Sequence, residues 1–198
     1  PPDSWQERIT LSIILSELRD LVTKAEQCFV LVFFYLEEGG MVMVREEKLF
    51  GMPAEQGRWV FVLLGLVSNI CLGSVYAWSV FKKPVEELFH IGATQSALPF
   101  TVFLAFFALL MPFAGKLIEK YGPRTVAIAG GIIVGLGWIL SKYASDITFM
   151  TVTYGAIAGA GVGIVYGAPI AVSTRWFPDK KGLAVGLTLL GFGMSALI

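Results

Sequence analysis

Residues that could do chemistry are distributed unevenly along this chain. From residue 58 onward, every acid, every base and the histidine His90 lie between five apolar runs, and none of them lies inside a run. The polar side chains inside the runs include the amide of Asn69 and the hydroxyls of Tyr76, Thr101 and Tyr166. These groups donate and accept hydrogen bonds, but they provide neither a nucleophile–base pair nor a proton relay. The sequence therefore disfavours an enzyme, and it indicates no metal site and no cofactor.

The five apolar runs are the elements that must position these groups. They cover residues 59–81, 91–115, 125–141, 147–174 and 182–198. About 20 residues of α-helix are needed to cross a hydrocarbon core roughly 30 Å thick, and the runs are close to this length or longer. They lack the two-residue alternation of membrane strands, and backbone amides in lipid must pair internally. With 56% apolar and only 15% charged residues, the chain is predicted to be an all-α membrane protein whose main partner is the lipid bilayer.

The basic residues between the runs predict an orientation. One set of connections carries seven bases, namely Arg58, Lys116, Lys120, Arg124, Arg175, Lys180 and Lys181, whereas the alternate set carries Lys82, Lys83 and Lys142. By the positive-inside rule, the seven-base face is cytoplasmic, as is the start of the first span. We therefore expect a multi-pass protein of the cell membrane with a cytoplasmic N-terminus. Nothing in this pattern suggests a surface for nucleic acid.

Residues 1–57 differ from the rest and are interpreted as an N-terminal extension. They hold ten acids and five bases, whereas residues 58–198 hold five acids and ten bases. Apolar residues at 14, 18, 21, 22, 25 and 29 fall on one helical face, but the apolar run at 28–36 is too short to span a membrane. The segment is either an amphipathic helix on a membrane or partner, or an extension without such a role.

Small residues recur at helical spacing in several runs. The fourth run has Gly155, Gly159, Gly163 and Gly167 at intervals of four, the first has Gly65, Asn69, Gly73 and Ala77, and the third has Gly131 and Gly135. Such stripes let helices approach closely, which in lipid replaces the hydrophobic drive for association. The spacing suits helices that slide or rock in a transporter, and it also suits a static membrane assembly or scaffold protein.

The connection after the second run carries a motif formed by Gly115, Glu119, Lys120, Gly122 and Arg124. It resembles the cytoplasmic signature of the major facilitator superfamily, with Glu119 and Lys120 where that family usually has Asp and Arg. The resemblance implies a gating motif whose charges lock the cytoplasmic side when it is closed. Gly122 followed by Pro123 is expected to form the short turn.

A longer stretch, residues 159–193, resembles the fourth helix, cytoplasmic loop and fifth helix of the oxalate/formate antiporter family. Its loop motif consists of Arg175, Trp176, Phe177, Pro178, Asp179, Lys180 and Gly182. Residues 73–81 of the first run are similar to the same family. The resemblance covers about 58–198, and it implies five of about twelve helices, with the missing C-terminal helices of the same transporter as a further partner.

The resemblance implies secondary transport of a small organic anion by alternating access. In that family a carboxylate lies between two helical halves, so Tyr76, Asn69, Tyr166 and Thr101 become the expected substrate-binding residues here. Tyr76 lies seven residues after Asn69 and is therefore expected on the same helix face. Because Thr101 is the only polar side chain between residues 98 and 111, a monocarboxylate is at least as good a candidate as oxalate. The static scaffold remains the alternative.

Overall fold

The computed structural model describes residues 48–49 and 52–195 of the chain. Of the N-terminal extension at 1–57, only residues 48–49 and 52–57 fall within this part. The predicted amphipathic helix therefore lies outside the described residues.

The described residues form helices in a single succession, after a small strand pair. Strand β1 (Lys48–Leu49) pairs antiparallel with β2 (Met52–Pro53). The helices are α2 (Ala54–Leu72), the 3₁₀ helix η1 (Gly73–Ala77), α3 (Trp78–Phe89), α4 (Ala93–Ser96), α5 (Leu98–Ser141), α6 (Ile147–Met150), the π-helix η2 (Thr151–Ala158), α7 (Gly159–Val165), α8 (Gly167–Trp176) and α9 (Lys181–Met194). The predicted all-α fold class is confirmed.

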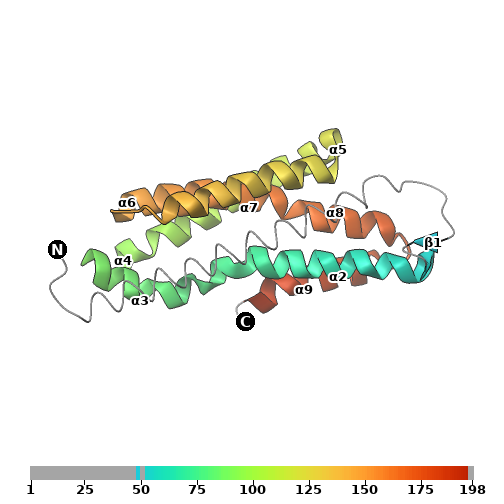
Figure 1. Cartoon of the computed structure of the whole chain (residues 1–198), viewed down its shortest axis with the longest axis horizontal. Helices are drawn as coiled ribbons and strands as arrows, with labels where there is room; N and C mark the ends of the chain where they lie inside the picture. Colours follow the sequence, from blue (N-terminus) through green and yellow to red (C-terminus); the bar gives the residue numbers. More distant parts are fainter. Residues whose placement is uncertain (1–47, 50–51, 196–198) are drawn as a thin grey trace.

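Helix α5 is two arms folded back on each other at Gly122. This residue has φ +82° and ψ 158°. These backbone angles are not helical, and a residue with a side chain rarely adopts them. Pro123 follows directly and cannot donate an amide hydrogen to the first arm. The expected turn at this pair is present, and Figure 1 shows the two arms running in opposite directions.

The segment from α6 to α8 runs lengthwise through the bundle and is interrupted twice. It begins at the cap residue Asp146, whose carboxylate accepts a hydrogen bond from the Thr148 amide at 3.3 Å. Helix η2 winds more loosely than an α-helix, and the chain bends between α7 and α8 at Tyr166. Pro169 has no amide hydrogen for the carbonyl four residues earlier, which weakens the helix at this bend.

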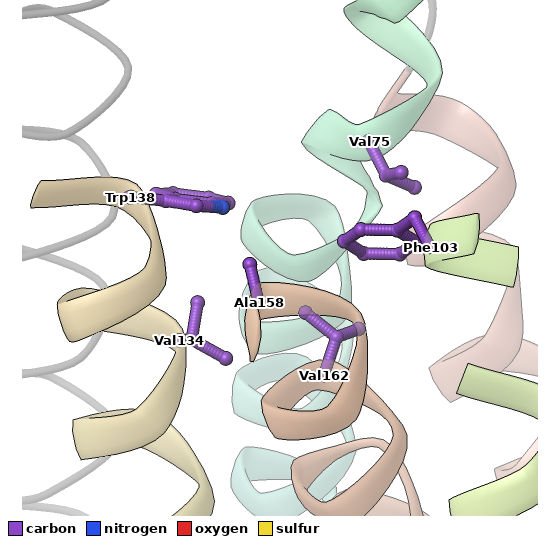
Figure 2. Close-up of a cluster of buried hydrophobic side chains, with 6 residues drawn as sticks. All are labelled: Val75, Phe103, Val134, Trp138, Ala158 and Val162. Carbon is purple, nitrogen blue, oxygen red and sulfur yellow. The ribbon is translucent and has the colours of Figure 1, made fainter. Parts of the chain in front are cut away.

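The bundle has two sides joined by the α6–α8 segment. In Figure 1, α2 and α9 lie along one side, the arms of α5 lie along the other, and α7 and α8 run between them. Figure 2 shows the central core cluster, to which both arms of α5, the η2–α7 segment and η1 contribute. Its buried members are Val75, Phe103, Val134, Trp138, Ala158 and Val162. The cluster therefore joins both arms of α5 to η1 and to the α6–α8 segment.

The glycine stripe of the fourth run lies directly against the first arm of α5. A Cβ atom added at Gly155 would lie 2.9 Å from the Pro99 carbonyl oxygen, and one at Gly163 would lie 2.8 Å from that of Phe107. The close approach predicted from the four-residue spacing is therefore present. The prediction for the third run is wrong at Gly135, which has open space around it, because Gly130 and Gly137 make the close contacts instead.

Length and composition single out two helical stretches of the described residues as candidate membrane spans. The helical stretches Ala93–Ser141 and Ile147–Trp176 are long and apolar enough to cross a bilayer, and the first contains both arms of α5. Helix α9 (Lys181–Met194) is a shorter apolar helix. The expected spans at 125–141 and 147–174 fall within these helices, as do residues 93–115 and 182–194 of two others, while the expected span at 59–81 falls in α2, η1 and α3.

The two sets of basic connections lie at opposite ends of the bundle. The start of α2, the turn of α5 and the connection from α8 to α9 all lie toward the right-hand end of Figure 1, and we call this the basic end. The end of α3 and the start of α6 lie at the left-hand end, which carries Lys82, Lys83 and Lys142. The seven-base and three-base sets of connections, which the sequence distinguishes, thus lie at opposite ends of the bundle.

Candidate functional site

Four aromatic rings from different parts of the bundle meet in one cluster. Tyr166, at the bend between α7 and α8, packs edge-to-face on Phe107 of α5 and Phe192 of α9, with ring centroids 5.2 and 5.1 Å apart. Tyr76 of η1 packs edge-to-face on Phe192 at 5.5 Å, and Phe107 and Phe192 stack at 6.0 Å. We call these four residues the aromatic cluster. Two of its members, Tyr76 and Tyr166, are residues that the sequence singled out.

The hydroxyls of the two tyrosines are available for a further partner. Tyr76 is 41% exposed and Tyr166 is half-buried. Within the described part of the chain, neither hydroxyl has a hydrogen-bond partner. A phenol donates one hydrogen bond and accepts others, so these two groups can bind a small polar solute between three helices. Phe107 and Phe192 were not predicted, because a phenylalanine in an apolar run carries no signal that separates it from ordinary packing.

Asn69 lies seven residues before Tyr76 and contacts none of the four rings of the aromatic cluster in the described residues. Its side chain is fully buried, and its Nδ2 donates to the Thr188 carbonyl oxygen of α9 at 2.9 Å. Tyr76 also contacts α9, through Phe192, and Thr188 and Phe192 lie four residues apart on that helix. Asn69 and Tyr76 therefore both face α9, at different depths of burial.

Thr101 is placed on the exposed surface of the first arm of α5. Its hydroxyl donates to the carbonyl oxygen of Ala97 at 3.0 Å, one turn earlier in the helix. This bond occupies the hydroxyl hydrogen that a solute would need. Among the described residues Thr101 does not contact the aromatic cluster, so its role as a solute ligand stays a prediction.

The predicted gating motif lies at the basic end, around the turn of α5. Gly122 supplies the turn, whereas Gly115 has no atom near its missing side chain and so meets no close neighbour in this arrangement. Glu119 and Lys120 are exposed, and the Lys120 ammonium lies 5.1 Å from the centre of the Tyr121 ring. The proposed charge lock within this motif stays a prediction.

The predicted loop motif between α8 and α9 contains an ion pair that sequence reasoning missed. Arg58 of α2 donates from Nη1 and Nη2 to the two carboxylate oxygens of Asp179, at 2.9 and 3.0 Å. The same guanidinium lies 4.6 Å from the ring centre of Phe177, which is fully buried and packs edge-to-face on Trp59. A two-pronged charge pair supported by a cation–π contact holds the start of α2 to the loop.

Comparison with known proteins decides the family. The model of the Major Facilitator Superfamily matches residues 59–198, which is most of the chain. The chain belongs to the major facilitator superfamily. The match covers α2 to α9 and leaves the N-terminal extension outside it, as expected from the sequence. Members of this superfamily are carriers embedded in membranes by many helices, and they are not enzymes.

Several curated members of the superfamily are similar to this chain. The "Oxalate:formate antiporter" of Oxalobacter formigenes is 33% identical over 141 residues, which cover 71% of this chain and 34% of that protein. "Monocarboxylate transporter 14" of Homo sapiens is 31% identical over 71% of this chain and 28% of its own length. "Monocarboxylate transporter 2" of Homo sapiens is 29% identical over 143 residues, which cover 70% of this chain and 30% of that protein. The chain thus spans about a third of the length of these superfamily relatives.

The ion pair at the basic end of this superfamily member predicts a pH dependence of stability. The hydrogen bond from Arg58 holds the pKa of the Asp179 carboxyl below its usual value, and the nearby Arg58 and Lys180 charges act in the same direction. A lowered folded-state pKa means that the stabilisation is complete above the unfolded value of about 3.9 and is lost as the pH falls through the folded value. We expect Asp179→Asn to lower the melting temperature at pH 7, and the difference from wild type to shrink below about pH 4.

Thermal unfolding of the detergent-solubilised protein, followed across a pH series, checks this prediction. The control repeats Asp179→Asn in an Arg58→Gln background, where the pair is already broken and the substitution should bring little pH-dependent difference. A pH-independent effect of Asp179→Asn with Arg58 present would contradict the assignment of the stabilisation to the carboxylate.

Proposed function

We propose that the protein containing this chain carries a small organic anion, a mono- or dicarboxylate, across the cell membrane by alternating access. Membership of the superfamily supports transport of a solute. The relatives' names support the class of solute, since one is named for oxalate and formate and others for monocarboxylates. Because this chain spans about a third of their length, the activity belongs to the whole protein of which these helices form one part.

The observation that carries the proposal is the placement of the two tyrosine hydroxyls in the aromatic cluster. A carboxylate has two oxygens that accept hydrogen bonds, and Tyr76 and Tyr166 can each donate one from a different helix. The rings of Phe107 and Phe192 beside them suit a short apolar tail. This combination fits a monocarboxylate at least as well as oxalate, which has a second charge and no apolar part.

The arrangement of the ends supports the proposed orientation and movement. With the basic end in the cytoplasm, the turn of α5 and the loop at 177–180 face the side where the positive-inside rule expects them. Because α7 contacts both arms of α5 through glycines, it can shift along them while it stays closely packed. Alternating access then opens the aromatic cluster to one side of the membrane at a time.

The static scaffold receives no support from the described residues. Its argument depended on glycine stripes that would hold separate chains together, but Gly155, Gly159 and Gly163 are covered by α5 of the same chain. They are therefore accounted for by the fold of one molecule. Transport remains the function that the cluster and the family favour.

The proposal is tested with the full-length protein in proteoliposomes. We expect uptake or exchange of radiolabelled formate, lactate or oxalate, saturable and competed by unlabelled acid of the same kind. Liposomes without protein are the control for leakage. Liposomes with an Arg58→Gln variant, reconstituted to the same amount, are the control for gating. The absence of uptake across a panel of small carboxylates, with protein that is folded by size-exclusion chromatography, would overturn the solute class.

A further inference from the structure

Three buried polar side chains form a chain of hydrogen bonds through the helices α2, α9 and α8. Asn69 Nδ2 donates to the carbonyl oxygen of Thr188, and the hydroxyls of Thr188 and Ser173 lie 2.9 Å apart. The Thr188 hydroxyl also donates to the Ala184 carbonyl oxygen at 2.8 Å. Since a hydroxyl has one hydrogen, Ser173 must be the donor to Thr188. We call Asn69, Thr188 and Ser173 the polar lock, and all three are fully buried.

Each member of the polar lock lies four or seven residues along the chain from one member of the aromatic cluster. Asn69 precedes Tyr76 by seven residues on α2 and η1, and Thr188 precedes Phe192 by four residues on α9. Ser173 follows Tyr166 by seven residues along α8. The lock therefore fixes three helices about one or two turns away from three of the four rings. The fourth ring, Phe107, comes from α5 and lies outside this connection.

The polar lock selects one register of α2 on α9, which the surrounding apolar contacts do not. Around it, α2 and η1 meet α9 through glycines, with Gly191 of α9 against the Leu66 carbonyl oxygen and Gly73 of η1 against that of Phe192. Smooth glycine contacts tolerate a slide or rotation of one helix on another, and lipid competes equally for apolar side chains. A buried hydrogen bond at one point selects one register, as a single buried asparagine does in coiled coils.

The orientation of the Asn69 amide is determined by this environment. Its Nδ2 faces a carbonyl oxygen, so the reversed amide would place two acceptors against each other. In the described residues its Oδ1 is buried and has no hydrogen-bond partner. A buried amide with one unmet acceptor is costly, and an apolar residue of the same size would avoid that cost. Its presence is explained by the register that it sets.

We infer that Asn69, Thr188 and Ser173 are positioning residues that set the geometry of the aromatic cluster, and that Asn69 acts through α9 and not on the solute. The inference rests on the proposed function for its effect on transport, but its structural part stands without it. It also reassigns Asn69 from the solute ligand expected from sequence to a buried residue two turns from the site.

The test follows the cluster directly with 3-fluorotyrosine incorporated at position 166 of the full-length protein in detergent. Its ¹⁹F resonance senses the two neighbouring rings of Phe107 and Phe192. We expect Asn69→Leu and Thr188→Val to move this resonance by at least about half the displacement that Phe192→Leu produces. Thr188→Ser, which keeps the hydroxyl, should leave the resonance near its wild-type position.

A matched control uses a second buried hydroxyl pair far from the lock. The Ser141 hydroxyl of α5 lies 2.7 Å from the Gly137 carbonyl oxygen and 3.0 Å from the Thr153 hydroxyl of η2, and these two acceptors share its one hydrogen because Thr153 donates to Phe149. Ser141→Ala removes a comparable buried bond, and it should leave the fluorine resonance unmoved even if it lowers stability. If it moves the resonance as Thr188→Val does, the lock has no special role and the inference is overturned.

Transport kinetics separate positioning from direct contact. In the lock variants we expect KM for the carboxylate to rise about fivefold or more, with the maximal rate per folded transporter within about twofold of wild type. A raised KM in Asn69→Leu with an unmoved fluorine resonance would show that Asn69 contacts the solute, and would overturn the inference. If the wild-type protein carries no carboxylate, the proposed function fails, while the fluorine result still decides the lock. Should Asn69→Leu fail to fold, Thr188→Val with its Thr188→Ser partner decides the lock alone.

Discussion

Replacing Gly159 by valine is expected to prevent the chain from reaching its folded state. A Cβ atom at this position would lie 2.7 Å from the carbonyl oxygen and 2.9 Å from the Cα atom of Phe103. These are backbone atoms, so no side-chain rotation can relieve the overlap. Separating α7 from α5 would also open the contacts at Gly155 and Gly163. Even Gly159→Ala should destabilise the protein by about 1–3 kcal/mol.

Gly135 provides the matched control for this prediction. It lies in the second arm of α5, and no atom lies within 4 Å of the position its Cβ would take. Gly135→Ala should be neutral or should stabilise the helix by up to about 1 kcal/mol, because alanine has the higher helix propensity. Melting temperatures in detergent, together with the yield of monodisperse protein, compare the two variants. Equal melting temperatures would contradict the close approach of α7 to α5.

The sequence predicted those parts of the fold that depend on local chemistry. The absence of charge along the apolar runs placed the helices, and Gly122 with Pro123 placed the turn between the arms of α5. The four-residue spacing of Gly155, Gly159 and Gly163 identified one contact face of the fourth run. In each case the residue type determines the local conformation or the approach of a neighbour, so no knowledge of distant residues was needed.

Other features depend on which helices pack against each other, and the sequence alone does not reveal this. The helix that contains α7 has a second contact face, on which Gly161 lies against Val134 and the Gly130 carbonyl oxygen. Gly130 was therefore in contact where Gly135 was expected. The pairing of Arg58 with Asp179 joins residues 121 positions apart and has no local signal.

Removing the hydroxyl of Tyr166 is expected to weaken carboxylate transport strongly while leaving the fold unchanged. Tyr166→Phe keeps the ring that packs on Phe107 and Phe192, and so keeps the aromatic contacts. A hydrogen bond to a charged group contributes about 1.5–3 kcal/mol, which corresponds to roughly a tenfold or greater rise in KM. Tyr76→Phe should act in the same direction. The measurement is the concentration dependence of uptake by the full-length protein in proteoliposomes.

The double variant of Tyr76 and Tyr166 shows whether the two hydroxyls act on one solute. If both donate to the same carboxylate, losing one leaves the solute free to shift toward the other, so the two effects on KM should not simply multiply. Tyr143→Phe is the control, since Tyr143 is 70% exposed at the far end of the bundle and should not affect uptake. Unchanged KM in both single variants, with full uptake by wild type, would mean that the carboxylate is bound elsewhere. The aromatic cluster would then be a packing feature, and the charge selectivity would have to come from groups outside the described helices.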